Sequence, residues 1–279
     1  MTTINITKKS GEHEPFSEEK LRRSLGRVHA PPALIDAVVA HVEGELTEGM
    51  KTSEIYRRAF SLLRKNDRPV AARYSLKNAL MELGPTGRPF ERFVGELLRS
   101  EGFETQVARV VQGVCVKHEV DVVGQKGDRH IMVECKFHNR PGLRSDVKIA
   151  LYVQARFEDV EREWKKQPQH GEKFHEVWLV TNTKLTSDAI DYAECVGMQA
   201  VGWSYPLHHG LEVRIDQSGL HPITCLTSLN RAQKRALLEK DVILCRELLD
   251  DPRLLQSVGV SETKVFTVTD EINRLCRVS

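Results

Sequence analysis

Two apolar segments in the middle of the chain, each with charged residues set into it, constrain the fold more than any other feature. The first runs from Glu119 to Val123 and the second from His130 to Phe137. Residues 124–128 between them form a short polar stretch with two glycines, which is typical of the turn in a β-hairpin. The sequence therefore predicts an antiparallel pair of strands here.

Side chains alternate between the two faces of a strand, so the hairpin also predicts which residues meet. The first strand presents Asp121 on a polar face, opposite to Val120 and Val122. The second strand presents Glu134 and Lys136 on one face, with the apolar residues Ile131, Val133 and Cys135 on the other. We therefore expect Asp121 to lie near Glu134.

Two carboxylates that converge from adjacent strands repel each other unless a cation lies between them, and hard oxygen ligands favour Mg²⁺ or Mn²⁺. Lys136 lies about 7 Å beyond Glu134 along an extended strand, so its ammonium can orient or activate a water without ligating the metal. A metal ion and a lysine meet the needs of phosphodiester hydrolysis. A surface ion-pair ladder is the alternative, but charges in such apolar runs are unfavourable to bury without a partner.

The spacing of these residues resembles the PD-(D/E)xK nuclease superfamily, because Asp121 is followed after twelve residues by Glu134-Cys135-Lys136. Phe90-Glu91 on a helix before the hairpin and Gln154 on the helix after it are similar to the Mrr-like restriction endonuclease branch. No proline precedes Asp121, which departs from the superfamily's name. The resemblance implies that Asp121, Glu134 and Lys136 are catalytic, and that Asp121 and Glu134 bind Mg²⁺ with Glu91 as a further candidate ligand. It also implies that Gln154 binds the DNA substrate.

Around the hairpin, the pattern from residue 86 to 205 predicts a mixed sheet flanked by helices. An apolar helical face through Phe90 and Leu98 precedes the hairpin, and Gly102 closes this helix. After the hairpin we expect a helix through 147–160, a strand at 177–180, a helix at 187–196 and a strand at 199–203. His118, at the start of the first hairpin strand, is either a catalytic base or an ordinary polar residue.

Residues 1–85 predict a short strand followed by helices, with Ser17 as an N-cap. Residues 6–11, 16–21, 51–55 and 71–74 resemble the ATP-cone domain, a mostly helical module that binds ATP or dATP. The resemblance implies that Lys8, Lys9 and Lys20 face the nucleotide phosphates, and that Glu14 and Thr52 help to place the nucleotide. Ser10 stands where the family usually has an acidic residue.

Residues 206–279 predict a small helical module. Apolar residues recur at helical spacing from Leu226 to Leu249, and two short helices around Gly259 resemble a helix-hairpin-helix. Four basic residues are candidates for contacts with a DNA backbone, although a plain packing role is equally compatible with the pattern. They are Arg231, Lys234, Arg235 and Lys264.

The composition sets limits on these expectations. A chain of 279 residues is long enough for two or three domains. Its net charge of only +2 gives no global attraction for nucleic acid, so any DNA contact must come from a local patch. The six cysteines show no paired spacing typical of zinc or redox sites, and no apolar run approaches the ~20 residues of a membrane span. We therefore expect a cytoplasmic protein without membrane contact.

The sequence thus predicts an α/β multidomain protein: an ATP-cone (1–85), a restriction-endonuclease-like domain (86–205) and a helical module (206–279). The predicted function is metal-dependent DNA cleavage, regulated by ATP or dATP, in the restriction of foreign DNA. One alternative is a nucleotide-sensing DNA-binding regulator with an inactive nuclease fold, and another is a repair or RNA-processing nuclease. A homo-oligomer is also expected, because ATP-cones commonly act through assembly.

Overall fold

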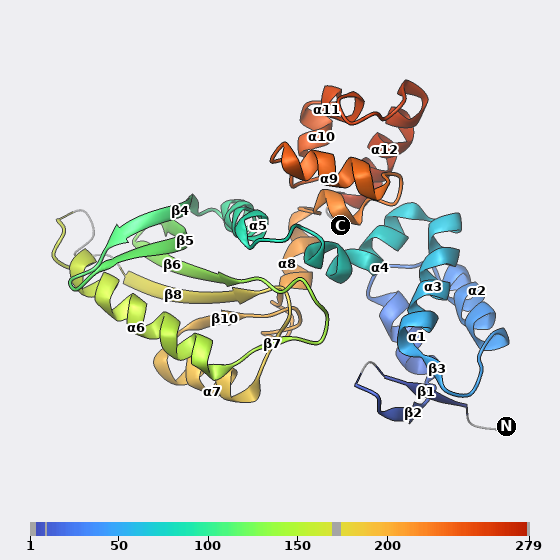
Figure 1. Cartoon of the computed structure of the whole chain (residues 1–279), viewed down its shortest axis with the longest axis horizontal. Helices are drawn as coiled ribbons and strands as arrows, with labels where there is room; N and C mark the ends of the chain where they lie inside the picture. Colours follow the sequence, from blue (N-terminus) through green and yellow to red (C-terminus); the bar gives the residue numbers. More distant parts are fainter. Residues whose placement is uncertain (1–3, 9, 169–173, 278–279) are drawn as a thin grey trace.

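The computed structural model describes residues 4–8, 10–168 and 174–277, which form three parts along the chain (Figure 1). In Figure 1 an N-terminal part with a helical bundle lies on the right, a large sheet with its helices lies on the left, and a group of shorter helices lies at the top. The predicted α/β multidomain class is confirmed. Within these residues no helix is long and apolar enough to cross a membrane.

The N-terminal part joins a small sheet, with strand order β2-β1-β3, to a helical bundle. β1 is antiparallel to β2 and parallel to β3. Ser17 caps α1 as predicted, because its hydroxyl accepts a hydrogen bond from the Lys20 N–H. The elements are β1 (Asn5–Thr7), β2 (His13–Pro15), α1 (Glu18–Gly26), α2 (Pro32–Gly44), β3 (Met50–Lys51), α3 (Thr52–Asn66) and α4 (Arg68–Met81).

Helix α4 buries apolar residues on more than one side because it packs into three hydrophobic cores. Val70 belongs to the core of the N-terminal part. Ala72 and Ala79 belong to the core of the C-terminal helices, and Leu76 and Leu80 to the core on one face of the large sheet. A helix buried in this way has no polar stripe. It mechanically links the three parts of the chain.

The large sheet has strand order β10-β8-β6-β5-β4. β4, β5 and β6 are antiparallel neighbours, whereas β6, β8 and β10 run parallel. The predicted hairpin is therefore β5–β6, but its strands extend further toward the turn than expected and leave only Gly127 and Asp128 between them. The elements are α5 (Arg88–Ser100), β4 (Glu104–Gln112), β5 (Lys117–Lys126), β6 (Arg129–Lys136), β7 (Arg144–Ser145), α6 (Val147–Trp164), β8 (Phe174–Thr181), β9 (Lys184–Leu185), α7 (Ser187–Val196) and β10 (Gln199–Val201).

Helices cover both faces of this sheet, as the apolar strands require. α5 packs on one face through Phe90 and Phe93. α6 and α7 cover the other face, where Val153 and Ala189 share a core with Met132. Because both faces are buried, the strands carry nearly continuous apolar runs rather than simple alternation.

The C-terminal part consists of short helices, and the expected helical run from Leu226 to Leu249 is interrupted. α9 ends before Asp241, which adopts a positive φ of 61° that a continuing helix cannot accommodate. Lys234, one of the basic residues considered for DNA contact, instead donates a hydrogen bond to the Thr224 carbonyl at 2.6 Å. The elements are α8 (Leu211–Ser218), η1 (Ile223–Cys225), α9 (Arg231–Glu239), α10 (Glu247–Asp250), α11 (Arg253–Gln256) and α12 (Glu262–Leu275).

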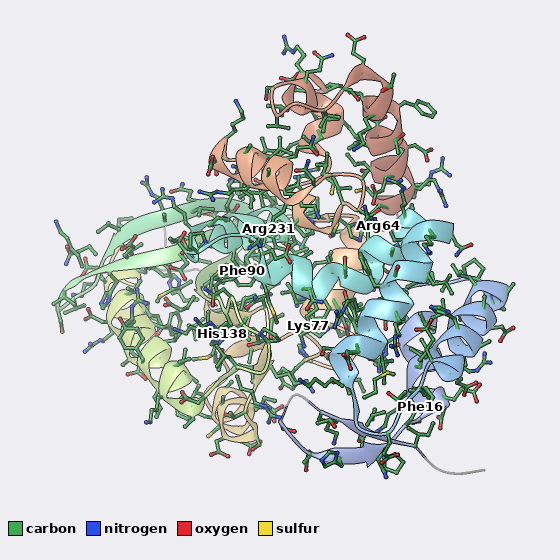
Figure 2. All side chains as sticks on the ribbon, turned by 45° about the vertical axis from the view of Figure 1, so that its right-hand side comes forward. Phe16, Arg64, Lys77, Phe90, His138 and Arg231 are labelled. Atoms are coloured by element: carbon green, nitrogen blue, oxygen red, sulfur yellow. The ribbon has the colours of Figure 1, made fainter. Side chains whose placement is uncertain are left out.

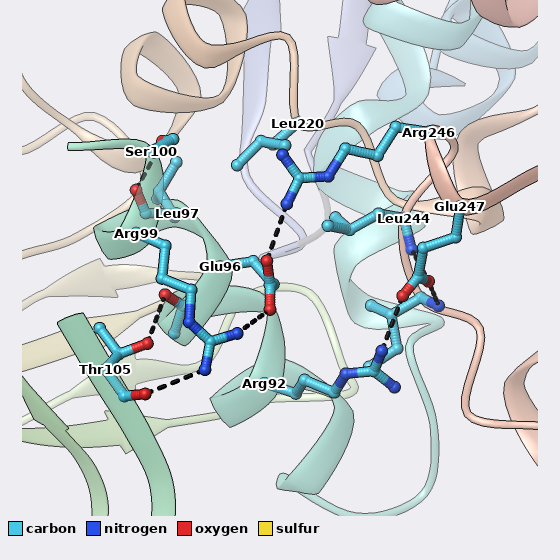
Figure 3. A network of polar contacts seen from close by, with 12 residues as sticks. Arg92, Glu96, Leu97, Arg99, Ser100, Thr105, Leu220, Leu244, Arg246 and Glu247 are labelled. Carbon is cyan, nitrogen blue, oxygen red and sulfur yellow. Dashed lines mark hydrogen bonds and ion pairs between the residues drawn. The ribbon is translucent and has the colours of Figure 1, made fainter. Parts of the chain in front are cut away.

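Ion pairs fasten the C-terminal helices to α5, as Figure 3 shows. Arg92 on α5 pairs with Glu247 at 2.7 Å, and Arg246 pairs with Glu96 on α5 at 2.7 Å. Arg99 extends this network by donating to the Thr105 carbonyl at the start of β4. The large sheet with its helix α5 and the C-terminal part are thus held together by charged as well as apolar contacts.

Candidate active site

The β5–β6 ladder ends at the two predicted carboxylates. Its register runs from Lys126↔Arg129 to Val122↔Val133 and stops before Asp121 and Glu134. Beyond this point the Asp121 Oδ2 atom accepts a hydrogen bond of 2.6 Å from the Cys135 N–H. The Cys135 N–H therefore donates to the Asp121 side chain, whereas in a continuing ladder it would donate to the backbone. The two strands separate around the carboxylates.

The predicted alternation fails at the same residue. Val120 packs in the core under α6, whereas Val122 packs in the core under α5. The prediction that both valines share one face is therefore wrong. The alternation rule assumes a regular pleat, and the pleat is disturbed at Asp121, opposite Ala108, whose φ is +52°. This disturbance directs the Asp121 carboxylate along the sheet toward β6.

The Asp121 carboxylate is electrostatically unfavourable as it stands. Burial, followed by the charges of Glu134 and Glu91, raises the pKa of Asp121 to about 7. The Cys135 hydrogen bond and the charge of Arg156 oppose this shift. A cation that binds at this carboxyl would favour its ionised form further.

Glu91, the third predicted acidic residue, lies in the first turn of α5. Burial raises its pKa, and the charges of Glu119 and Glu134 add to the increase, whereas Arg88 opposes it. A Cβ atom on Gly87 would come within 3.2 Å of the Glu91 Oε1 atom, so the chain passes close to this carboxylate. The helix before the hairpin thus brings Glu91 to the same acidic group as Asp121 and Glu134.

Glu134 forms an ion pair with Arg156 of α6, with 2.5 Å between Nη1 and Oε2. Arg156 also donates to the Glu119 carbonyl, and its guanidinium lies 5.2 Å from the centre of the Tyr152 ring. The sequence analysis missed Arg156. The available signal was its position one turn beyond Tyr152 on the helix that follows the hairpin.

Lys136 ends β6 in register with Thr181 of β8, and its side chain is exposed next to the buried Cys135. Within the described residues no three His, Cys, Asp or Glu side chains are arranged to enclose a metal ion. The donor chemistry nevertheless fits a hard cation, because the group offers carboxylate oxygens only and repulsion raises the pKa of Asp121. One carboxylate oxygen of Asp121 and one of Glu134 are not used by the hydrogen bonds described above.

Gln154 lies on a different side of α6 from Arg156. Its amide donates to Glu158 at 3.1 Å, and it lines a cavity of about 740 Å³ that begins at Asp128 and Arg129, where β6 starts. The acidic group lies at the other end of β6. The structure therefore does not bring Gln154 together with the carboxylates, and its predicted contact with substrate stays a prediction. His118 has a structural partner, because its Nε2 atom lies 2.9 Å from Asp159.

The predicted nucleotide-binding residues gather at one end of the small sheet. Glu14 lies between Lys8 and Lys20, at 3.1 Å from each ammonium, and these hydrogen bonds lower its pKa, with Lys8 contributing most. Thr52 begins α3 directly after β3, whose Lys51 is in register with Thr7 of β1. Lys9 lies outside the described residues. Two lysines, Glu14 and Thr52 thus share a neighbourhood, but the lysines already have an anionic partner.

The large sheet carries carboxylates where its hairpin strands separate, and it is joined to a small, mostly helical domain in which Lys8 and Lys20 flank Glu14. These features define a restriction-endonuclease-like domain behind a nucleotide-binding module. Family models agree: residues 4–80 match the ATP cone domain, 84–201 the restriction endonuclease domain, and 221–276 the AF1548-like C-terminal domain. The predicted combination of ATP-cone and Mrr-like nuclease domain is confirmed.

One relative is an uncharacterized protein of Archaeoglobus fulgidus, 38% identical over 183 residues, which are 65% of this chain and 99% of that protein. The crystal structure of the protein of unknown function AF1548 is similar as well, with a TM-score of 0.55 and 35% identity, over 68% of this chain and 98% of that one. The chain belongs to the family of this archaeal protein, and it carries an ATP-cone domain, a restriction endonuclease domain and an AF1548-like C-terminal domain.

Proposed function

We propose that the protein is a metal-dependent DNA endonuclease whose activity is controlled by ATP or dATP bound to its ATP-cone domain. The observation that carries the proposal is the convergence of Asp121, Glu134 and Glu91 where the β5–β6 ladder ends. Burial and the charge of Glu134 raise the pKa of Asp121 to about 7. Such a group is unfavourable for fold stability alone, and perturbed carboxyls of this kind concentrate at functional sites.

In this proposal Asp121 and Glu134, with Glu91 as a further ligand, hold Mg²⁺ or Mn²⁺. The bound ion supplies an activated water and relief for the charge that develops on the phosphate. The Cys135 N–H fixes one oxygen of Asp121, and Arg156 fixes one oxygen of Glu134, which leaves the second oxygen of each for the ion. Lys136, two residues beyond Glu134, orients the attacking water or a phosphate oxygen.

The route for regulation in this proposal is α4. The helix belongs to the ATP-cone domain, yet it also contributes to the cores of the sheet and of the C-terminal helices. A nucleotide that binds Lys8, Lys9, Lys20, Glu14 and Thr52 at the small sheet would act on the nuclease through this shared helix. Restriction of foreign DNA in the cytoplasm is the proposed setting, with a homo-oligomer as the proposed active assembly.

Plasmid cleavage tests the proposal. The natural chain, Asp121→Ala, Lys136→Ala and the control Lys166→Ala are each incubated with Mg²⁺ or EDTA, with and without ATP or dATP. Lys166 is a suitable control because it is exposed, pairs with Glu163 near the end of α6 and is not among the candidate DNA or nucleotide contacts. We expect Mg²⁺-dependent nicking that both site variants lose and the control keeps, with a rate that changes on nucleotide addition.

A second candidate is a DNA-binding regulator without cleavage. Two observations favour it: Arg156 forms an ion pair with Glu134, and among the described residues no three His, Cys, Asp or Glu side chains are arranged to enclose a metal ion. Unchanged DNA with every metal, on methylated and unmethylated plasmid alike, combined with nucleotide-dependent DNA binding, would select this candidate over the nuclease.

A further inference from the structure

Two cations face the same way on the small β7–β9 ribbon. Arg144 and Lys184 are direct partners in the parallel register of these strands. Both side chains are exposed, whereas the following residues, Ser145 and Leu185, are buried. Side chains directly opposite each other in a ladder lie on one face, and like charges there destabilise the pairing. The ribbon thus holds two positive charges together at an energetic disadvantage.

A third cation reaches this place from the ATP-cone domain. Lys77 on α4 lies with its ammonium 5.6 Å from the centre of the Trp203 ring, where α4 meets the nuclease domain (Figure 2). The backbone N–H of Trp203 in turn donates at 2.7 Å to the carbonyl of Thr183, the residue before Lys184. Burial lowers the pKa of Lys77, and the charge of Lys184 lowers it further, while Glu212 opposes the shift.

None of these three cations forms an ion pair within the part of the chain that the structure describes. By contrast, Lys8 and Arg92 each pair with two carboxylates. A fold that fixes three positive charges together, one of them half-buried, is stabilised by an anion that binds between them.

The three cations lie close to the proposed nuclease centre. His138, two residues after Lys136, exchanges two hydrogen bonds with Asn182, and its Nε2 atom lies 3.2 Å from the Ser145 hydroxyl on β7. Ser145 also donates to Thr181 at the end of β8. The ribbon is therefore fastened to the carboxyl ends of β6 and β8, and ligands of open α/β sheets bind beyond such ends.

We propose that Lys77, Arg144 and Lys184 form a binding subsite for the DNA backbone phosphate, shared between the ATP-cone helix α4 and the nuclease domain. The inference rests on the proposed DNA nuclease function and extends it. The phosphate beside the scissile bond would neutralise the three charges, and DNA would bridge the two domains. Because Lys77 is carried by α4, a nucleotide-driven movement of that helix would change DNA affinity directly.

The test measures binding without cleavage. Fluorescence anisotropy of a labelled DNA duplex is recorded in EDTA over a range of KCl concentrations for the natural chain, K77Q, R144Q, K184Q and the triple variant. Loss of one lysine or arginine contact to phosphate lowers the slope of log affinity against log salt by roughly one. We expect each single variant to show this loss and the triple variant to show more, while the control K166Q and the charge-conserving K77R keep the natural slope.

Thermal unfolding separates this role from a structural one. K77Q removes a half-buried, unneutralised charge, so its melting temperature without DNA should equal or exceed that of the natural chain. A clear decrease in K77Q and K77R alike would assign Lys77 to packing against Trp203 and overturn its part in the subsite.

Three binding results distinguish the remaining possibilities. Natural salt slopes in all three single variants and in the triple variant, with DNA still bound, would overturn the subsite and leave the nuclease proposal standing. A natural chain that neither binds nor cuts DNA would overturn both. Variants with unchanged DNA binding but weakened ATP binding would show that the phosphate belongs to the nucleotide, which also overturns the proposal.

Discussion

Asp121 and Asp159 are both largely covered carboxylates of the nuclease domain, yet their surroundings shift the carboxyl pKa in opposite directions. Asp159 on α6 accepts hydrogen bonds from the N–H groups of Cys115 and Val116, at 2.8 and 3.2 Å, and from His118. These bonds, the one from His118 first, hold the pKa of Asp159 well below its usual range. Asp121 receives one N–H and faces two carboxylates.

The difference separates a structural acid from a candidate functional one. The chain satisfies Asp159 with its own donors, which fix the β4–β5 loop to α6. Asp121, by contrast, has too little positive charge around it to balance the nearby carboxylates, and a bound cation could supply that charge. A carboxylate that is satisfied within the fold supports stability, whereas an unsatisfied one reduces stability and is a candidate for chemistry.

The largest expected effect is the loss of cleavage in Asp121→Asn. Asparagine keeps the side-chain shape and can still accept the Cys135 N–H, but it removes the charge that would bind the metal. We expect the single-turnover cleavage rate to fall by about 10³-fold or more, equivalent to roughly 4 kcal/mol of activation free energy. Its melting temperature in EDTA should not fall. A variant that cuts at the natural rate would remove Asp121 from the site.

Asp159→Ala should have the opposite profile, with lower stability and retained cleavage per folded molecule. The substitution leaves two N–H groups and His118 without their acceptor. Gly113→Ala provides a matched variant, because a Cβ there would come within 2.2 Å of the Asp159 Oδ2 atom, and such overpacking costs about 1–3 kcal/mol. Urea unfolding measures both changes. Natural stability in both variants would show that the loop does not depend on Asp159.

The two aspartates should also give opposite pH dependence in the metal-free protein. The folded-state pKa of Asp121, about 7, lies above its ordinary value of 3.8. Between these pH values the folded state holds a proton that the unfolded state has lost, so the stability of the fold decreases as pH rises. Asp159 has a lowered pKa, so its contribution is present above its ordinary pKa and is lost as pH falls through its folded-state pKa.

Urea unfolding in EDTA at pH 5 and pH 8 measures this dependence. The stability gain of Asp121→Asn over the natural chain should grow by about 1–2 kcal/mol between these pH values, after allowance for partial screening by solvent. An equal gain at both pH values would contradict the raised pKa of Asp121.

The sequence predicted the hairpin and the helices α6 and α7 because their signals are local. Turn glycines, helical spacing and capping residues depend on neighbours in the chain. It did not predict β4, because this edge strand exposes Val110 and contains Ala108 at a positive φ, so no regular alternation appears. Edge strands that are half exposed carry a weak pattern.

The candidate site was predicted only in part, because local signals place some of its residues and not others. Asp121, Glu134 and Lys136 follow from strand spacing, and Glu91 from the family resemblance. The placement of Val120 was wrong because strand alternation assumes a continuous ladder, which ends at Asp121. Arg156 was missed because its contact joins residues 22 positions apart through packing of a helix on a sheet, which no local pattern encodes.

The smallest expected effect concerns the ATP-cone, where the charges resemble those around Asp159 more than those around Asp121. Lys8 and Lys20 already share Glu14, and all three side chains are in contact with solvent. A nucleotide must therefore compete with the Glu14 carboxylate for Lys8 and Lys20, whose charges are also screened by water. Lys20→Gln should weaken ATP binding by only about threefold to tenfold, as is typical of one exposed charge contact.

Isothermal titration of the full chain with ATP and with dATP measures this change, and Lys166→Gln serves as the control for loss of an exposed, ion-paired lysine. A loss far above tenfold would mean that the nucleotide buries Lys20 and frees it from Glu14, which would make this site as dependent on its ligand as the carboxylates around Asp121. No loss would place the phosphates away from α1, and the nucleotide would then have to reach α4 through the Thr52 end of α3 instead.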